Sequence, residues 1–176
     1  MKGWMQFALG TLVACGAGFT YAWIRGGQLP EVHEVSVKAR FKAPGPKLWA
    51  LISDLEGQPR WKKSLVSVKR IEGSEEVYVE DYGGTKLTLK TEERVEGQRL
   101  VRVLVNQNIP YQGSWTYVVE PLGQEECLLT LTEKAQIKNP VFRFLAQGFF
   151  GYEESLKAAL TELSAVAGPV EFQKNP

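Results

Sequence analysis

Residues 139–163 are NPVFRFLAQGFFGYEESLKAALTEL, a segment with the pattern of one long amphipathic helix. Asn139 is a favourable N-cap residue, and Pro140 suits the first helical position. Such a helix is roughly 40 Å long at about 1.5 Å per residue, enough to cross a whole sheet. Gly148 and Gly151 predict a bend within it, and we expect a portal beside that bend. The apolar face follows steps of three and four: Phe142, Leu145, Phe149, Tyr152, Leu156, Leu160 and Leu163.

Upstream of this helix, strand patterns dominate the chain. Residues 35–41 alternate apolar and polar side chains, as a half-buried strand does. After Pro46 the apolar spacing predicts a first short helix, and residues 55–64 predict a second short helix or a turn. Turns rich in glycine then separate short strand-like segments, which predicts an antiparallel meander. These segments cover about 65–72, 76–82, 85–94, 99–106, 112–120 and 126–136.

The element order is one strand, two short helices, six strands and one long helix. Over residues 34–166 this order resembles the helix-grip fold of the START/birch-pollen-allergen superfamily (SRPBCC), particularly the polyketide cyclase/dehydrase and lipid-transport type. The resemblance implies an α+β fold in which a curved antiparallel seven-stranded sheet wraps on the C-terminal helix. Its landmarks are Val35–Phe41, Pro46–Leu51, the Trp61 segment, Gly113–Trp115 and the Asn139–Leu163 helix.

The same resemblance implies a cavity between sheet and helix that binds lipids, sterols, quinones or other apolar molecules. A curved sheet leaves a gap above a straight helix, which side chains fill or a ligand occupies. For each lining residue, ordinary core packing is the alternative. We expect the lining to include Trp61, Leu87, Leu89, Trp115, Tyr117, Phe142, Leu145 and Phe149.

Catalysis has weaker support in the sequence than binding. A dehydratase or cyclase needs an acid or base in the cavity. The polar candidates are Asp81, Tyr82, Arg102, Tyr117 and Glu133. Each of them lies in a strand, where the outward face is equally open, and the superfamily shares no catalytic set to carry over. We therefore assign no catalytic residue.

Composition excludes several other functions. With two cysteines and one histidine, the chain lacks the residues of a zinc cluster or a disulfide framework, so we expect no metal and no cofactor. Lys and Arg total 21 against 20 Asp and Glu, which gives no excess charge for binding nucleic acid.

Residues 1–25 have the pattern of a membrane anchor. From Gly3 to Ile24 no residue carries a formal charge, and a bilayer core needs about 20 helical residues. Aromatic residues flank this apolar run, as they do at membrane interfaces. Two alternatives remain open: a lipoprotein lipidated at Cys15, since residues 12–15 resemble a lipobox, and a cleaved signal peptide.

The small residues Gly10, Ala14, Gly18 and Ala22 recur every four positions in the expected anchor, a spacing compatible with homodimerisation through one helix face. Beyond the anchor we expect a flexible linker over 26–33, the ligand-binding domain over 34–167 and a tail over 168–176. His33 falls in that linker, so we expect it to be solvated.

We therefore expect a membrane-tethered, single-pass protein that binds or transports an apolar small molecule or lipid. One alternative is a cyclase or dehydratase that uses the same cavity, and another is an interaction module whose cavity its own side chains fill. Basic residues around Trp61, namely Arg60, Lys62 and Lys63, are compatible either with an anionic membrane surface or with a solvated loop.

Overall fold

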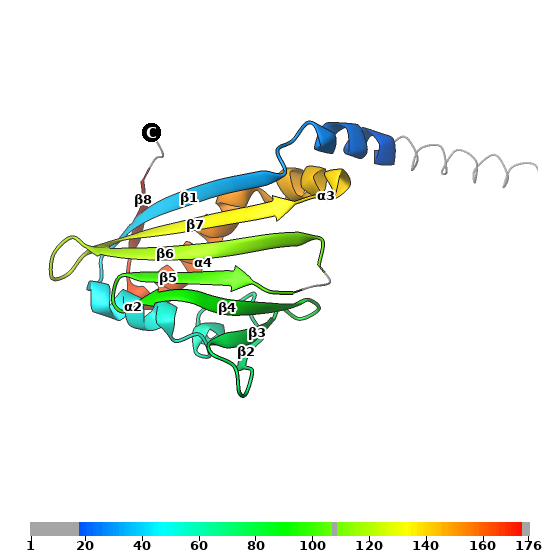
Figure 1. Cartoon of the computed structure of the whole chain (residues 1–176). Helices are drawn as coiled ribbons and strands as arrows, with labels where there is room; N and C mark the ends of the chain where they lie inside the picture. Colours follow the sequence, from blue (N-terminus) through cyan, green and yellow to red (C-terminus); the bar gives the residue numbers. More distant parts are fainter. Residues whose placement is uncertain (1–17, 107–108, 174–176) are drawn as a thin grey trace, which may run out of the picture.

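One antiparallel sheet forms the body of the protein (Figure 1). The computed structural model describes residues 18–106 and 109–173. Within them the strand order is β2-β3-β4-β5-β6-β7-β1-β8, so neighbours in sequence pair directly from β2 to β7. The strands are β1 (Val32–Phe41), β2 (Ser67–Arg70), β3 (Val77–Asp81), β4 (Lys86–Val95), β5 (Arg99–Leu104), β6 (Tyr111–Pro121), β7 (Cys127–Ile137) and β8 (Val170–Phe172).

The eighth strand corrects the expectation of seven. Gly168 adopts a φ of +140°, and the chain then turns back along the edge of β1. Lys42 donates its backbone N–H to the Pro169 carbonyl, and Ala39 pairs with Phe172. A segment of three paired residues is too short to show the period-two alternation from which the other strands were predicted.

Apart from a helix over residues 18–27, the helices of the described residues lie between β1 and β2 and after β7. They are α2 (Gly45–Ser53), the short 3₁₀ helix η1 (Gln58–Arg60), α3 (Pro140–Leu145), the π-helical turn η2 (Ala146–Phe150) and α4 (Tyr152–Ala167). The expected N-cap is present, because the Asn139 side chain accepts from the N–H of Phe142 at 3.1 Å. The single continuous helix is wrong, whereas the expected bend is confirmed: η2 widens the helix and Gly151, at φ +52°, separates it from α4.

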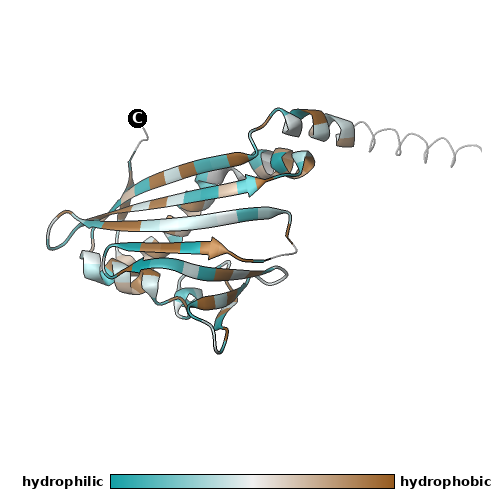
Figure 2. Cartoon of the chain, in the orientation of Figure 1, coloured by the Kyte–Doolittle hydropathy of each residue, from teal (hydrophilic) through white to brown (hydrophobic). Residues whose placement is uncertain are grey.

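The solid core occupies one end of the sheet–helix sandwich. Alternating residues of β1 and β7 face α4, a pattern visible as alternating colour along the strands in Figure 2. Val119 of β6 pairs with Leu129 of β7 at this end. The largest fully buried side chains here are Phe41, Leu48, Ile52, Leu129, Leu131, Leu160 and Leu163. Side chains buried this completely leave little free space between the sheet and α4 at this end.

A helix over residues 18–27 docks on α3. Gly26 lies so close that an added Cβ would be 1.7 Å from the Pro140 carbonyl oxygen. The Arg143 Nε donates to the Gly26 carbonyl at 2.9 Å, and the Tyr21 and Phe144 rings meet edge to face with centroids 5.7 Å apart. Residues 18–27 are therefore held against the domain by specific contacts.

This docking changes two expectations. The linker over 26–33 is not a free tether, because residues 26 and 27 are helical and β1 begins at Val32, where it pairs with Gln136. In the expected dimer face, Ala22 is already buried within the single chain. Small residues permit close approach of two backbones, and at Gly26 that approach occurs within the chain.

No helix among residues 18–106 and 109–173 is long and apolar enough to cross a membrane. Most of the expected anchor, including Cys15 and the small residues Gly10 and Ala14, lies outside the described residues.

Candidate functional site

Two adjoining cavities open at the end of the sheet away from the solid core. The first, which we call the polar chamber, has a volume of about 110 Å³. The second, the apolar cavity, has a volume of about 470 Å³. Leu87 and Trp115 line both, so they form the boundary between the two spaces. The polar chamber is further lined by Gln58, Lys62, Glu80, Tyr82, Leu89, Arg102 and Tyr117.

The apolar cavity lies between the sheet and the α3–η2–α4 segment. Its walls come from β1, β4, β6 and β7, from the β5–β6 connection, and from the helices opposite. Phe142 contributes from α3 although 42% of its surface is exposed, which places it at the rim. The apolar lining includes Leu87, Ile109, Pro110, Ala135, Ile137, Phe142 and Ala146.

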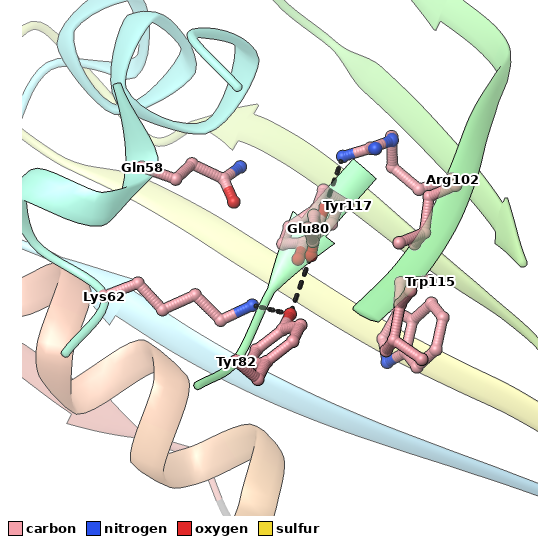
Figure 3. Close-up of a pocket in the computed structure, with 9 residues that line it drawn as sticks. Gln58, Lys62, Glu80, Tyr82, Arg102, Trp115 and Tyr117 are labelled. Atoms are coloured by element: carbon pink, nitrogen blue, oxygen red, sulfur yellow. Dashed lines mark hydrogen bonds and ion pairs between the residues drawn. The ribbon is translucent and has the colours of Figure 1, made fainter. Parts of the chain in front are cut away.

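A chain of hydrogen bonds runs through the polar chamber (Figure 3). The Lys62 Nζ donates to the Tyr82 hydroxyl at 3.1 Å, and that hydroxyl donates to Glu80 Oε2 at 2.7 Å. The other carboxylate oxygen, Glu80 Oε1, accepts from Arg102 Nη1 at 3.1 Å. Glu80 therefore connects the amine and phenol on one side to the guanidinium on the other.

Arg102 is a buried cation, and some of its N–H donors lack an acceptor among the described residues. Only 3% of its surface is exposed, and its guanidinium lies over the Tyr78 ring at 5.5 Å from the centroid. Among the described residues, neither Nε nor Nη2 has a hydrogen-bond acceptor. Buried donors without partners are rare in folded proteins, so these two N–H groups mark a place where an acceptor is expected.

Burial shifts the pKa values of the groups around Glu80. It lowers the pKa of the Lys62 amine, an effect that Glu80 opposes and that repulsion from Arg102 reinforces. Burial raises the pKa of the Tyr82 hydroxyl, and the neighbouring Glu80 carboxylate raises it further. Burial also raises the pKa of Tyr117 to about 12. The chamber thus combines an amine that loses its proton more readily than usual with phenols that keep theirs.

A second polar cluster lies in the apolar cavity. The Trp115 Nε1 donates to Glu133 Oε2 at 3.2 Å, and the His33 Nε2 is 3.7 Å from Glu133 Oε1. The expectation that His33 is solvated is wrong, because only 13% of its side chain is exposed. Since His33 pairs with Ala135 at the start of β1, the strand register turns it to the same face as Val35 and Val37.

Five of the eight expected lining residues do line a cavity: Leu87, Leu89, Trp115, Tyr117 and Phe142. Trp61, just after η1, packs partly buried against the core and lines neither space. Leu145 is 38% exposed and lines neither space, whereas its neighbour Ala146 faces the apolar cavity. The side chain of Phe149 lies outside what the structure describes.

Of the charged residues that line the polar chamber, Arg102 was among the polar candidates from the sequence, whereas Lys62 and Glu80 were not. Arg102 is in phase with the buried Leu100 and Leu104 of β5, and this alternation was the available signal. Glu80 is similarly in phase with Tyr78 on β3. Asp81, by contrast, faces out and pairs with Lys86 at 3.7 Å.

Lys62 was expected to be exposed near Trp61, either at an anionic membrane surface or in a solvated loop. Its amine instead reaches Tyr82 inside the polar chamber, so it contributes to neither of these. No signal in the local sequence distinguishes it from its basic neighbours, because η1 alone decides which of them points inward.

Within the described part of the chain, no three His, Cys, Asp or Glu side chains come together in a way that could hold a metal ion. Cys127 is buried in the core near Phe41 rather than in either cavity.

The chain matches one protein family in sequence and several solved structures in fold. The sequence model of the family described as "Polyketide cyclase / dehydrase and lipid transport" matches residues 32–168. No curated protein sequence matches the chain. The di-domain ARO/CYC BexL from the BE-7585A biosynthetic pathway superposes with a TM-score of 0.64 at 18% identity, covering 76% of this chain and 45% of that one. The chain therefore spans less than half the length of that di-domain protein.

Two further structures are covered almost completely. A START superfamily protein from Mycobacterium smegmatis superposes with a TM-score of 0.60 at 19% identity, covering 77% of this chain and 97% of that one. Norcoclaurine synthase from Thalictrum flavum, in complex with dopamine and hydroxybenzaldehyde, gives a TM-score of 0.60 at 12% identity, covering 81% and 90% respectively. At these identities the likeness concerns the fold alone.

Proposed function

Because this chain belongs to the polyketide cyclase / dehydrase and lipid transport family, we propose that it binds a largely apolar small molecule or lipid. The observation that carries the proposal is the apolar cavity of about 470 Å³ beside the polar chamber. Ligand sites are typically clefts of about 300–1,000 Å³ with apolar walls and a few polar groups. The polar groups in this mainly apolar lining include His33, Trp115 and Glu133.

Packing argues against the alternative of an interaction module whose cavity is filled. At the Phe41 end of the same domain large buried side chains fill the space between the sheet and α4, and the hollow at that end is lined instead by α2 and the β4–β5 turn, so this part of the fold can close. At the other end the wall residues Ala135 and Ala146 are small, and Phe142 stays partly exposed at the rim. This contrast within one domain supports a space kept open for a ligand.

The neutral fluorescent probe N-phenyl-1-naphthylamine tests this proposal on the full-length chain. We expect its emission to rise on binding and Trp115→Ala to weaken its affinity at least about fivefold with a small loss of stability. Leu129→Ala, in the solid core, is the matched control. It costs about 2–5 kcal/mol of stability, while its folded fraction still binds the probe. A wild-type chain that binds no probe would contradict the proposal.

Acid–base catalysis is a second candidate, favoured by one observation. The Tyr82 hydroxyl lies between the Lys62 amine and the Glu80 carboxylate, in hydrogen-bond contact with both. Burial lowers the pKa of this amine, so it can give a proton to a substrate oxygen while Tyr82 and Glu80 hold it in place. The test is turnover of a linear poly-β-ketone thioester. Tyr82→Phe and Glu80→Gln should abolish turnover while leaving probe binding in place, and turnover unaffected by both substitutions would exclude this chemistry.

We also propose that residues 3–24 tether the domain to a membrane. The support comes from the uncharged sequence and from the helix over residues 18–27, which exposes Phe19, Tyr21, Trp23 and Ile24. That helix docks on α3, whose Phe142 lies at the rim of the apolar cavity. A tether at this position would keep the cavity near lipid.

Alkaline carbonate washing of membranes tests the tether. We expect the full-length chain in the membrane pellet, and its appearance in the supernatant with an intact N-terminus would refute the tether. Mass spectrometry of the mature N-terminus separates the alternatives: an acylated chain that begins at Cys15 indicates a lipoprotein. We expect Cys15→Ser to leave an uncleaved anchor unchanged.

A further inference from the structure

The polar chamber has an excess of positive charge. Lys62 and Arg102 face it with Glu80 as the one carboxylate that lines it among the described residues. Arg102 repels Lys62 strongly enough to help lower the pKa of that amine. The single carboxylate is already shared between the Tyr82 hydroxyl and Arg102 Nη1. A further negative charge in this chamber would therefore be stabilised rather than repelled.

The unpartnered atoms of Arg102 define the shape of the missing acceptor. Glu80 occupies Nη1, which leaves Nε and Nη2. These two N–H groups lie along one edge of the planar guanidinium and point in nearly parallel directions. A carboxylate accepts two parallel N–H bonds from such an edge, in the geometry that makes Arg–carboxylate pairs strong and directional. Lysine at this position would provide only a point charge.

The boundary between the two cavities determines where the rest of a bound molecule lies. Leu87 and Trp115 line both spaces, so the polar chamber and the apolar cavity adjoin at these two side chains. The chamber of about 110 Å³ has room for a small head group, and the cavity of about 470 Å³ has room for a larger apolar part.

We propose that the ligand is an amphipathic carboxylic acid, with its carboxylate on the Arg102 edge and its apolar part in the apolar cavity. This inference rests on the proposed function, because it specifies the ligand class of the same site. Lys62 adds positive charge on the far side of Glu80, and Leu87 and Trp115 hold the carbons next to the head group. A neutral molecule of the same length would lose the paired hydrogen bonds and leave the two donors of Arg102 without a charged acceptor.

Decanoic acid and 1-decanol test the inference on the full-length chain. Each compound is titrated as a competitor against bound N-phenyl-1-naphthylamine, at concentrations below those at which the compound aggregates. The titration is done at pH 8, where the acid is ionised. We expect the acid to bind about tenfold more tightly than the alcohol, as is typical of a hydrogen bond to a charged group. In Arg102→Lys, which keeps the charge beside Glu80, the affinity for the acid should fall at least about fivefold while the affinity for the alcohol is unchanged.

A second variant keeps the test valid if Arg102→Lys folds poorly. Arg102→Met combined with Glu80→Leu removes both charges of this ion pair. The double variant should lose the preference for the acid while it still binds decanol. Arg99→Met, on the same strand but facing solvent, is the control and should preserve the preference.

The outcomes separate the inference from the function on which it rests. If the probe binds and the acid shows no advantage over the alcohol, the carboxylate inference is overturned and ligand binding stands. A preference that survives both Arg102 variants overturns it equally. If the probe itself does not bind, the proposed function fails, and the carboxylate inference fails with it.

Discussion

Arg102 and Glu80 form the most buried ion pair among the described residues, with Nη1 and Oε1 3.1 Å apart and side chains 4% and 5% exposed. Their strands, β5 and β3, are not neighbours but lie on either side of β4. The two long side chains therefore meet across the inner face of β4. This pair occupies Nη1 and leaves Nε and Nη2 of Arg102, a residue that lines the polar chamber, without an acceptor among the described residues.

Removing one partner of this pair should be costly. In Glu80→Leu the Arg102 charge stays buried without a counterion, and we expect a loss of about 3–5 kcal/mol in the free energy of unfolding. Glu80→Leu with Arg102→Met should recover most of that loss, because no uncompensated charge remains. Urea unfolding measures both. Glu93→Leu breaks the exposed pair with Arg99 and should cost less than about 1 kcal/mol; equal costs at the two pairs would contradict this account.

Lys62→Met should stabilise the protein at neutral pH. Burial holds the Lys62 pKa below its unfolded value of 10.5, so between these two pKa values the unfolded chain binds more protons than the folded one. The free energy of unfolding therefore rises with pH through that window. Below the folded pKa the amine is protonated in both states, and the full cost of burying its charge is present. The advantage of Lys62→Met in thermal midpoint should be largest near pH 7 and shrink toward pH 9.5.

The charges facing Lys62 set the design of this measurement. Glu80 and Glu162 favour the protonated amine, and Arg102 disfavours it. The series stops at pH 9.5 because Tyr82 and Tyr117, whose pKa values are raised, act in the opposite direction above about pH 10. Lys63→Met, at an exposed neighbour, is the control. A difference between Lys62→Met and wild type that does not vary with pH would show that the amine is not buried in solution.

Gly151→Ala should destabilise the break between η2 and α4. Gly151 has a φ of +52°, a conformation that costs a residue with a Cβ about 1–2 kcal/mol. Gly148→Ala is the matched control, because a Cβ there meets nothing within 4 Å and alanine favours helical backbone. Thermal unfolding should show a lower midpoint for Gly151→Ala alone. A loss in both variants would mean that the whole turn, rather than one backbone conformation, is sensitive.

Gly26→Ala should detach the helix over residues 18–27 from α3. The new Cβ would clash with the Pro140 carbonyl oxygen and separate Gly26 from the buried Arg143. Hydrogen exchange should accelerate across residues 18–27, with a smaller effect on the sheet. Gly27→Ala, where a Cβ meets nothing within 4 Å, should exchange like the wild type. Unchanged exchange in Gly26→Ala would show that the docked arrangement is not maintained in solution.

Local pattern was sufficient to predict most of the fold. The alternation in residues 35–41 and the turn glycines located β1 and the β2–β7 meander, because inward and outward side chains alternate wherever one face of a sheet is buried. The interruption at Gly151 was predictable from two glycines in one helix. The chain's return along β1 as β8 was not, since that pairing depends on an edge which exists only after the sheet has formed.

The candidate site was likewise predictable from the sequence only in part. Its apolar walls, such as Leu87, Trp115 and Phe142, were predictable because apolar side chains on the inner faces of strands and helices meet in any helix-grip arrangement. The placement of His33 was not, because the start of β1 is set by its partner strand rather than by its own short, polar sequence.

The sequence by itself determined the order of elements from β1 to β7, because that order depends on periodicity within short windows, and the resemblance to the family rested on this order. Only the tertiary structure decided that Lys62, Glu80 and Arg102 share one chamber. A charged side chain is buried only when a distant segment supplies its partner, and these three come from the η1 region, β3 and β5. The pairing of strands on either side of β4 brings the partners together, and with them the donors that a ligand would meet.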